Sequence, residues 1–161
     1  MIKIKKNKGI SLIEILIVVG LIAIISAIAG LNLSQFHNQQ VLRNTTEDVI
    51  SLLNEARNDT ISSKNSNTYG IHFQTDRAIL FIFTGTTFNI NDSSNVSVIF
   101  DTAVIIPTTG GINLIGGGSD IVFDRLTGET AKYGTIIIRL TNNATSQKIV
   151  TISKIGVIGS N

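Results

Sequence analysis

The sequence predicts an α+β fold in which one long N-terminal helix packs against an antiparallel β-sheet, or against two sheets, that form a head. Two observations support this fold class. Residues 10–61 have helical periodicity and contain no proline, whereas from Thr68 onward short runs of β-branched and aromatic residues alternate with Gly, Asn, Asp and Thr. Because no helical segment of comparable length returns, the strands are expected to cover the apolar face of the helix.

The first part of the expected helix, residues 10–33, has the length and apolar character of a membrane-spanning segment. It would be roughly 36 Å long, against about 30 Å for a hydrocarbon core, and Glu14 is its only ionisable side chain. Four lysines and no acidic residue precede it in residues 1–8. The positive-inside rule therefore places the N-terminus in the cytoplasm and exports the chain beyond Leu33.

The second part, residues 34–64, has the amphipathic pattern of a helix that continues into the head. The spacing from Thr45 to Asp48 also fits a capping box that would open a separate helix, but the uninterrupted pattern favours a single one. The segment SSKNSN, residues 62–67, predicts the end of the helix near Ile61. The apolar face consists of Leu42, Val49, Leu52, Leu53, Ala56 and Thr60.

The remaining residues, 65–161, are expected to form the β-rich exported head. Turn signals rich in Gly, Asn, Asp and Thr separate its apolar runs. The runs that predict strands are residues 69–74, 78–83, 96–100, 103–106, 121–123, 135–140 and 148–153.

The head offers few groups for catalysis, so neither an enzyme nor a cofactor or metal site is predicted. The sequence contains no cysteine, which excludes disulfides, a thiolate nucleophile and a cysteine zinc site. His37 and His72 have no His or Cys partner at ligand spacing and are expected to be structural or solvated. Asp101, Asp120 and Asp124 flank expected strands, where acidic residues usually solubilise an edge rather than act as a catalytic pair.

Two polar loops are candidate binding sites. The run Gly116–Gly117–Gly118 lacks the Lys-Ser/Thr and the following helix of a phosphate-binding loop, and is better interpreted as a flexible connection. The turn at residues 89–95 is rich in oxygen ligands that Ca²⁺ could use, but it has a single carboxylate. An Asx-rich hairpin loop is the expectation there.

The N-terminal segment, from Lys8 through Gly9, Ile10 and Ser11 to Glu14, resembles the class III signal of type IV pilins and type II secretion pseudopilins. In that family a basic leader ends in Gly, cleavage follows it, the new N-terminal residue is methylated, and the fifth mature residue is Glu. The resemblance implies a leader over residues 1–9 that ends at Gly9, an N-methylated mature N-terminus at Ile10, and an assembly carboxylate at Glu14. Ile10 stands where the family more often has Phe.

Parts of the head resemble the GspH/FimT-type minor pseudopilins and pilins. These parts are residues 53–61, residues 121–124 with the following Gly128, and residues 148–156. The basic residue that often follows the terminal Gly of that family is absent, because Val157 follows Gly156.

The charge balance also argues against nucleic acid as a partner. Cleavage after Gly9 removes four of the 13 Lys and Arg residues and leaves nine against 11 Asp and Glu, so the side chains of the mature chain sum to −2 instead of the +2 of the whole sequence. A basic nucleic-acid-binding surface is therefore not expected.

Small residues at helical spacing form an expected packing stripe on residues 10–33. Gly20, Ala23, Ala27 and Gly30 lie at i, i+3, i+7 and i+10, and such stripes allow helices to approach closely. Small residues are also common in membrane helices generally, so the stripe is equally consistent with having no special role.

The resulting hypothesis is a minor pilin or pseudopilin, a structural subunit of a type II secretion pseudopilus or a type IV pilus. Its expected partners are other such subunits, the prepilin peptidase, the inner-membrane assembly platform and the membrane, which it crosses once with the N-terminus cytoplasmic. One alternative is a tip pilin that binds DNA or a surface. A second is a secreted soluble domain, because residues 27–29, Ala-Ile-Ala, resemble an ordinary signal-peptidase site.

Overall fold

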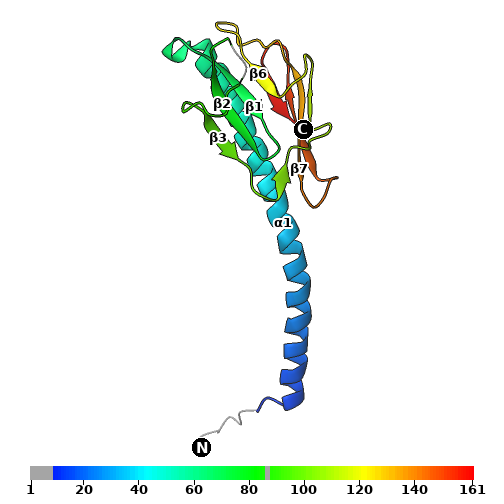
Figure 1. The fold of residues 1–161 in the computed structure, drawn as a ribbon. Helices are drawn as coiled ribbons and strands as arrows, with labels where there is room; N and C mark the ends of the chain where they lie inside the picture. The colour runs from blue at the N-terminus through cyan, green and yellow to red at the C-terminus, as the bar shows by residue number, and fades with distance from the viewer. Residues whose placement is uncertain (1–8, 86–87) are drawn as a thin grey trace, which may run out of the picture. The chain divides into compact units, whose positions relative to one another are not determined.

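The structure is a computed structural model that describes residues 9–85 and 88–161, apart from the side chains of residues 28–33. Helix α1 covers Leu12–Ile61 without a break and ends at the predicted residue (Figure 1). A short 3₁₀ turn, Lys64–Ser66, follows inside the segment expected to stop the helix. The single continuous helix means that the Thr45 to Asp48 spacing opens no separate element.

The strands that follow α1 form two antiparallel sheets, which confirms the predicted α+β fold. The first sheet has the order β3 (Val96–Ile99), β2 (Arg77–Phe83), β1 (Thr68–Phe73) and β6 (Asp120–Val122). The second has the order β4 (Val104–Ile105), β7 (Gly134–Leu140), β8 (Gln147–Ile152) and β9 (Ile158–Ser160), and β5 (Ile112–Leu114) also pairs with β7.

All seven predicted strands are present, with ends that differ by at most one residue. The prediction omits two short strands, β5 and β9. β5 consists of three residues between glycine-containing turns, and β9 contains Gly159. Neither segment has enough alternating apolar residues to show the strand period in the sequence. Both are held by pairing with the longer strands β7 and β8.

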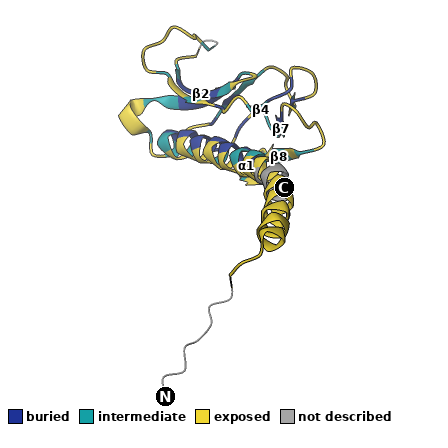
Figure 2. Ribbon diagram, turned by 90° about the horizontal axis from the view of Figure 1, so that it is seen from below, coloured by how far each residue is buried: buried dark blue, intermediate teal, exposed yellow. Residues whose placement is uncertain are grey.

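The hydrophobic core of the head lies between one face of α1 and the two sheets. The predicted apolar face of the helix, from Leu42 to Thr60, is buried at every position, and Figure 2 shows these buried turns facing the strands. Along β7 the residues Ile136, Ile138 and Leu140 are buried and alternate with half-buried ones. This alternation is the pattern of a strand with one face on the core.

The first sheet has a second apolar face, which lies away from the core cluster. Along β2, Ala78, Leu80 and Ile82 belong to or pack on the core cluster, so the intervening Phe81 and Phe83 point to the other side of the sheet. In the pairing register, Phe81 lies opposite Gly70 of β1. A Cβ atom on Gly70 would meet the Phe81 ring at 2.9 Å, so the ring uses the space that glycine leaves.

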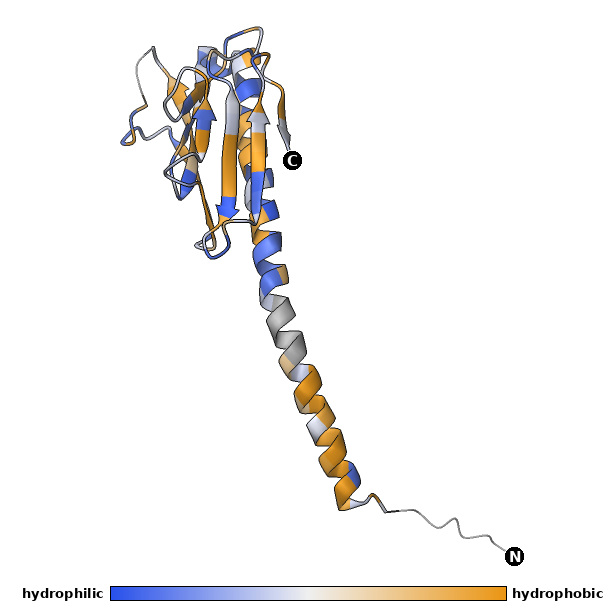
Figure 3. Cartoon of the chain, turned by 90° about the vertical axis from the view of Figure 1, so that its right-hand side faces the viewer, coloured by the Kyte–Doolittle hydropathy of each residue, from blue (hydrophilic) through white to orange (hydrophobic). Residues whose placement is uncertain are grey.

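The chain divides into two compact units, Met1–His37 and Asn38–Asn161. In the first unit, the helix from Leu12 to Ala27 is predominantly hydrophobic (Figure 3), and each of its described residues is exposed. Within the described residues, no helix combines the length and the apolar character needed to cross a membrane. The membrane span expected for residues 10–33 stays a prediction.

Candidate functional site

The segment in which cleavage is expected lies just before the first turn of α1. Gly9, Ile10 and Ser11 are outside the helix and exposed. A Cβ atom on Gly9 would meet nothing within 4 Å, and the Ile10 side chain is 73% exposed. A peptide bond in exposed, non-helical chain is accessible to a protease. The leader residues 1–8 lie outside the described residues.

Glu14 lies in the first turn of α1, which begins at the Ser11 carbonyl. That oxygen accepts hydrogen bonds from the N–H groups of Glu14, at 3.1 Å, and Ile15, at 3.3 Å. A carboxylate is favoured in the first turn of a helix because the helix dipole is positive there. Glu14 is exposed and forms no ion pair with any residue in the described ranges.

The expected packing stripe is open in the structure. Gly20, Ala23 and Ala27 are exposed, and a Cβ atom on Gly20 would meet nothing within 4 Å. Gly30 lies outside the residues whose surroundings are described. The large apolar residues around the stripe are also exposed in the part of the chain that the structure describes. The role of the stripe stays a prediction.

The head brings together residues that the sequence left apart. His72 of β1 and Asp120 of β6 are directly opposite in the register, and their Nδ1 and Oδ1 atoms are 2.5 Å apart. The His72 ring stacks on Phe88, with centroids 4.0 Å apart and an angle of 6° between the planes. Phe88 also makes an edge contact with Phe81 at 5.4 Å. The described partners of the His72 ring are thus an acid and an aromatic ring.

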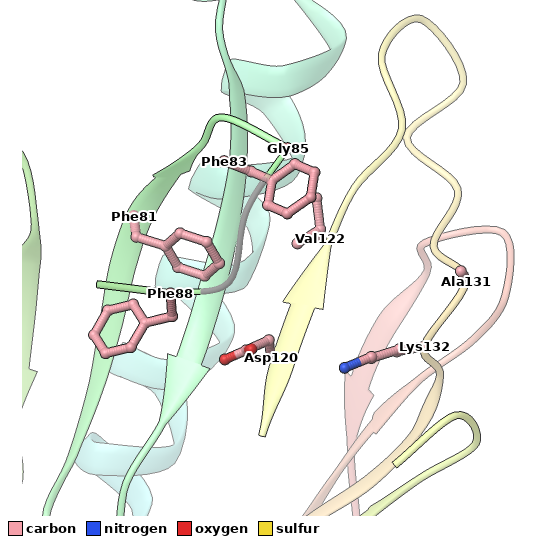
Figure 4. Close-up of a pocket in the computed structure, with 8 residues that line it drawn as sticks. All are labelled: Phe81, Phe83, Gly85, Phe88, Asp120, Val122, Ala131 and Lys132. Carbon is pink, nitrogen blue, oxygen red and sulfur yellow. The ribbon is translucent and has the colours of Figure 1, made fainter. Parts of the chain in front are cut away.

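Asp120, Phe81 and Phe88 border a cavity of about 340 Å³ on the outer face of the first sheet. Figure 4 shows the rings of Phe81, Phe83 and Phe88 on one side, Asp120 in the middle, and the Lys132 side chain extending toward Asp120 from the other side. Sequence reasoning missed Phe88 and Lys132, because neither lies in a recognisable motif. The described residues that line it are Phe81, Phe83, Gly85, Phe88, Asp120, Val122, Ala131 and Lys132.

The other polar candidates have local structural roles. Asp101 accepts a hydrogen bond from the Ala103 N–H at 2.8 Å, and the main chain of Asp124 bonds to that of Glu129 and Gly128. In the turn at residues 89–95, Asp92 accepts hydrogen bonds from both the N–H and the hydroxyl of Ser94. Across the described ranges, no group of three or more His, Cys, Asp or Glu residues could hold a metal ion.

Local hydrogen bonds shift the pKa of several charged groups on the head. The backbone N–H of Ser94, followed by its hydroxyl, lowers the pKa of Asp92 below the ordinary aspartate value. The Arg77 guanidinium lowers the pKa of the neighbouring Asp76 in the same way. Asp59 accepts a hydrogen bond from Lys64 at 2.6 Å and raises the pKa of that ammonium group. None of these groups lines the cavity.

Comparison with known proteins identifies the N-terminal segment. Residues 4–30 match the family model described as the prokaryotic N-terminal methylation motif. No curated protein and no solved structure matches the chain at a significant level. The matched range contains Gly9, Ile10 and Glu14, and the motif implies a membrane-anchored precursor that is processed as a prepilin. The match is confined to this N-terminal segment and does not extend into the head.

Proposed function

We propose that the protein is a minor pilin or pseudopilin of the GspH/FimT type. It is cleaved after Gly9, methylated on the new amine of Ile10, and built into the helical filament of a type II secretion pseudopilus or a type IV pilus. The observation that carries the proposal is the methylation motif over residues 4–30, joined to an exposed, non-helical Gly9–Ile10 segment. The single helix followed by two antiparallel sheets is consistent with it.

Glu14 gives this proposal an assembly mechanism. Cleavage after Gly9 creates a positively charged amine at Ile10, and the Glu14 carboxylate has no ion-pair partner in the described part of its own chain. In a medium of low dielectric constant, an unpaired carboxylate is costly and attraction to an amine is strong. Pairing of Glu14 with the Ile10 amine of a neighbouring subunit therefore favours insertion of the new subunit into the filament.

The membrane topology of the chain and its partners follow from the same proposal. The precursor crosses the inner membrane once through residues 10–33, with the lysine-rich leader in the cytoplasm and the head outside. The prepilin peptidase removes the leader. The assembly platform then moves the subunit from the membrane into the filament, where residues 10–33 pack against the same segment of other subunits.

The direct test is mass spectrometry of the mature chain purified from its native membrane. The expected N-terminal peptide starts at Ile10 and is heavier by one methyl group. A chain that retains Met1 would contradict the pilin assignment. A chain that begins near Gly30 would instead show an ordinary secretory signal.

A second test separates processing from assembly. Glu14→Gln keeps the shape of the side chain and removes its charge, so the variant is expected to be cleaved and methylated normally but to enter filaments less well. Glu47→Gln is the matched control, because Glu47 is an exposed acid on the same helix. The measurement is the ratio of subunit in sheared filaments to subunit in membranes. Equal ratios for the two variants would contradict the charge-pairing mechanism.

A further inference from the structure

The cavity on the outer face of the first sheet has an aromatic wall, which is formed by one strand and by the loop that follows it. Phe81 and Phe83 come from β2, and Phe88 comes from the loop that follows this strand. Phe88 is held by its stack on His72 and by its edge contact with Phe81. Strand β2 sets the positions of Phe81 and Phe83, and the two ring contacts set the position of Phe88. The wall is therefore formed before a ligand binds.

The carboxylate in the cavity is also held in position. Asp120 Oδ1 is bonded to His72 Nδ1, and the two residues are cross-strand neighbours on β6 and β1. Asp120 therefore presents a positioned acceptor, on a half-buried side chain, beside the phenylalanine rings.

Lys132 approaches the cavity from the other side, and its main chain is fixed. The Thr130 hydroxyl accepts a hydrogen bond from the Lys132 N–H at 3.2 Å and donates one to the Lys132 carbonyl at 3.0 Å. The lysine side chain runs over the glycine loop: a Cβ atom on Gly118 would lie 3.1 Å from its Nζ, and one on Gly116 would lie 3.3 Å from its Cγ. Within residues 9–85 and 88–161, Lys132 forms no ion pair.

The cavity thus combines opposite charges at two separate positions with an apolar wall. A ligand with one charge is attracted by one of the two groups and repelled by the other. A zwitterion satisfies both, with its ammonium group toward Asp120 and the phenylalanine faces, where a cation is favoured, and its carboxylate toward Lys132. The volume of about 340 Å³ is at the lower end of the range for small-molecule sites, roughly 300–1,000 Å³.

From this complementarity we infer that the head binds a small zwitterion with an apolar body, of the class of the apolar α-amino acids. The apolar side chain of the ligand packs on Phe81, Phe83 and Phe88. Its ammonium group pairs with Asp120 and its carboxylate with Lys132. All of the residues assigned to this site belong to the second unit of the chain, outside the segment in which cleavage is proposed.

The first test uses the full chain in detergent micelles. It compares the binding of amino acids with that of half ligands, which are analogues that lack one of the two charged groups. The probes are L-phenylalanine, L-leucine, 3-phenylpropionate, which lacks the ammonium group, and phenethylamine, which lacks the carboxylate. Saturable binding is expected for at least one of the amino acids, about tenfold tighter than for either half ligand. Equal affinity for a half ligand, or no saturable binding of either amino acid, overturns the inference.

The second test uses variants that change Lys132 or its support. Lys132→Met is expected to weaken amino-acid binding by about tenfold. Phenethylamine binding should not weaken, because the substitution removes a like charge that repels this ligand, whereas a general loss of structure would weaken both. Lys154→Met, at an exposed lysine outside the cavity, is the control. If phenethylamine and the amino acids weaken equally in Lys132→Met, the assigned role of the lysine is wrong.

A pair of glycine variants covers the case in which Lys132→Met does not fold. Gly117 and Gly118 both have positive φ, 68° and 80°, so alanine strains the backbone at either position. Only the Gly118 Cβ would touch the Lys132 ammonium; at Gly117 nothing lies within 4 Å. Gly118→Ala is therefore expected to weaken amino-acid binding more than Gly117→Ala, and equal effects of the two variants overturn the inference.

Discussion

Two glycines bring two turns of the head into contact beside the last turns of α1. Gly156 has a φ of +77°, and a Cβ atom there would lie 1.9 Å from the Gly128 carbonyl oxygen. Gly128, with a φ of +67°, leaves room for the Ile61 side chain, and its carbonyl accepts a hydrogen bond from Arg57 Nε at 3.3 Å. A Cβ atom at Gly156 would require backbone to move, and one at Gly128 would require the Ile61 and Arg57 side chains to move.

Alanine at Gly156 is accordingly expected to destabilise the head. The positive φ alone costs on the order of 1–3 kcal/mol, and the contact with the Gly128 oxygen adds to it. Gly159→Ala is the control, because a Cβ atom there meets nothing within 4 Å, and its effect should stay within about 0.5 kcal/mol. Chemical denaturation followed by circular dichroism measures both, and similar losses would refute the account.

The Asp92 turn makes a prediction about pH. Hydrogen bonds from Ser94 lower the pKa of Asp92 in the folded chain. The stabilisation of the turn is therefore complete above the unfolded pKa and is lost as pH falls through the lower, folded value. Carboxyl NMR titration should place the Asp92 midpoint below that of an unfolded aspartate.

Ser94→Ala tests which hydrogen bond causes this shift. The backbone N–H of Ser94 is the larger cause and survives the substitution, so most of the lowering should remain. The Asp76 midpoint is the internal control, since its lowering comes from Arg77. An Asp92 midpoint that returns fully to the unfolded value in Ser94→Ala would show that the hydroxyl, and not the N–H, sets the pKa.

At the level of elements, long periodic segments could be predicted and short paired ones could not. The helix through Leu53 and the strand through Ile136 carry their burial pattern in their own residues. β5 and β9 exist because β7 and β8 offer them hydrogen bonds, which is a tertiary effect. The same division applies to the candidate sites. Gly9, Ile10 and Glu14 follow from a contiguous motif, whereas the cavity depends on β2, β6 and a turn meeting in space.

The junction between α1 and β1 depends on one hydroxyl group. Thr60, in the last turn of the helix, is fully buried, and its Oγ1 accepts a hydrogen bond from the Tyr69 N–H at 2.8 Å. The first strand is therefore tied to the helix end at the point where the chain reverses. A buried N–H without an acceptor costs about 1–3 kcal/mol.

Thr60→Val should remove this tie, while Thr60→Ser preserves it. Valine keeps the volume and leaves the Tyr69 N–H unsatisfied, so the amide of Tyr69 is expected to exchange with solvent faster. Serine retains the oxygen and loses one methyl group, which lowers stability without exposing that amide. Hydrogen exchange of Tyr69 separates the two cases, and unchanged protection in Thr60→Val would disprove the tie.

At the scale of the whole molecule, the core belongs to the second unit alone. Among the described residues, burial begins at Leu42, and every member of the core cluster lies in residues 38–161. A chain that starts at Asn38 is therefore expected to fold cooperatively, with a free energy of unfolding within about 0.5 kcal/mol of that of the head in the full chain. Chemical denaturation of both proteins measures this, and a truncated chain without a cooperative transition would contradict it.

The apolar side chains on α1 from Leu12 to Ala27 have a thermodynamic consequence. They are exposed on all sides of the helix, and burial of each one is worth roughly 1.5–3 kcal/mol. Their burial therefore depends on other molecules. Under the proposed function these are lipid and neighbouring subunits, which compete for the same surface. A subunit of that kind would have a critical concentration: below it the membrane holds the chain, and above it added subunits enter the polymer while the free pool stays constant.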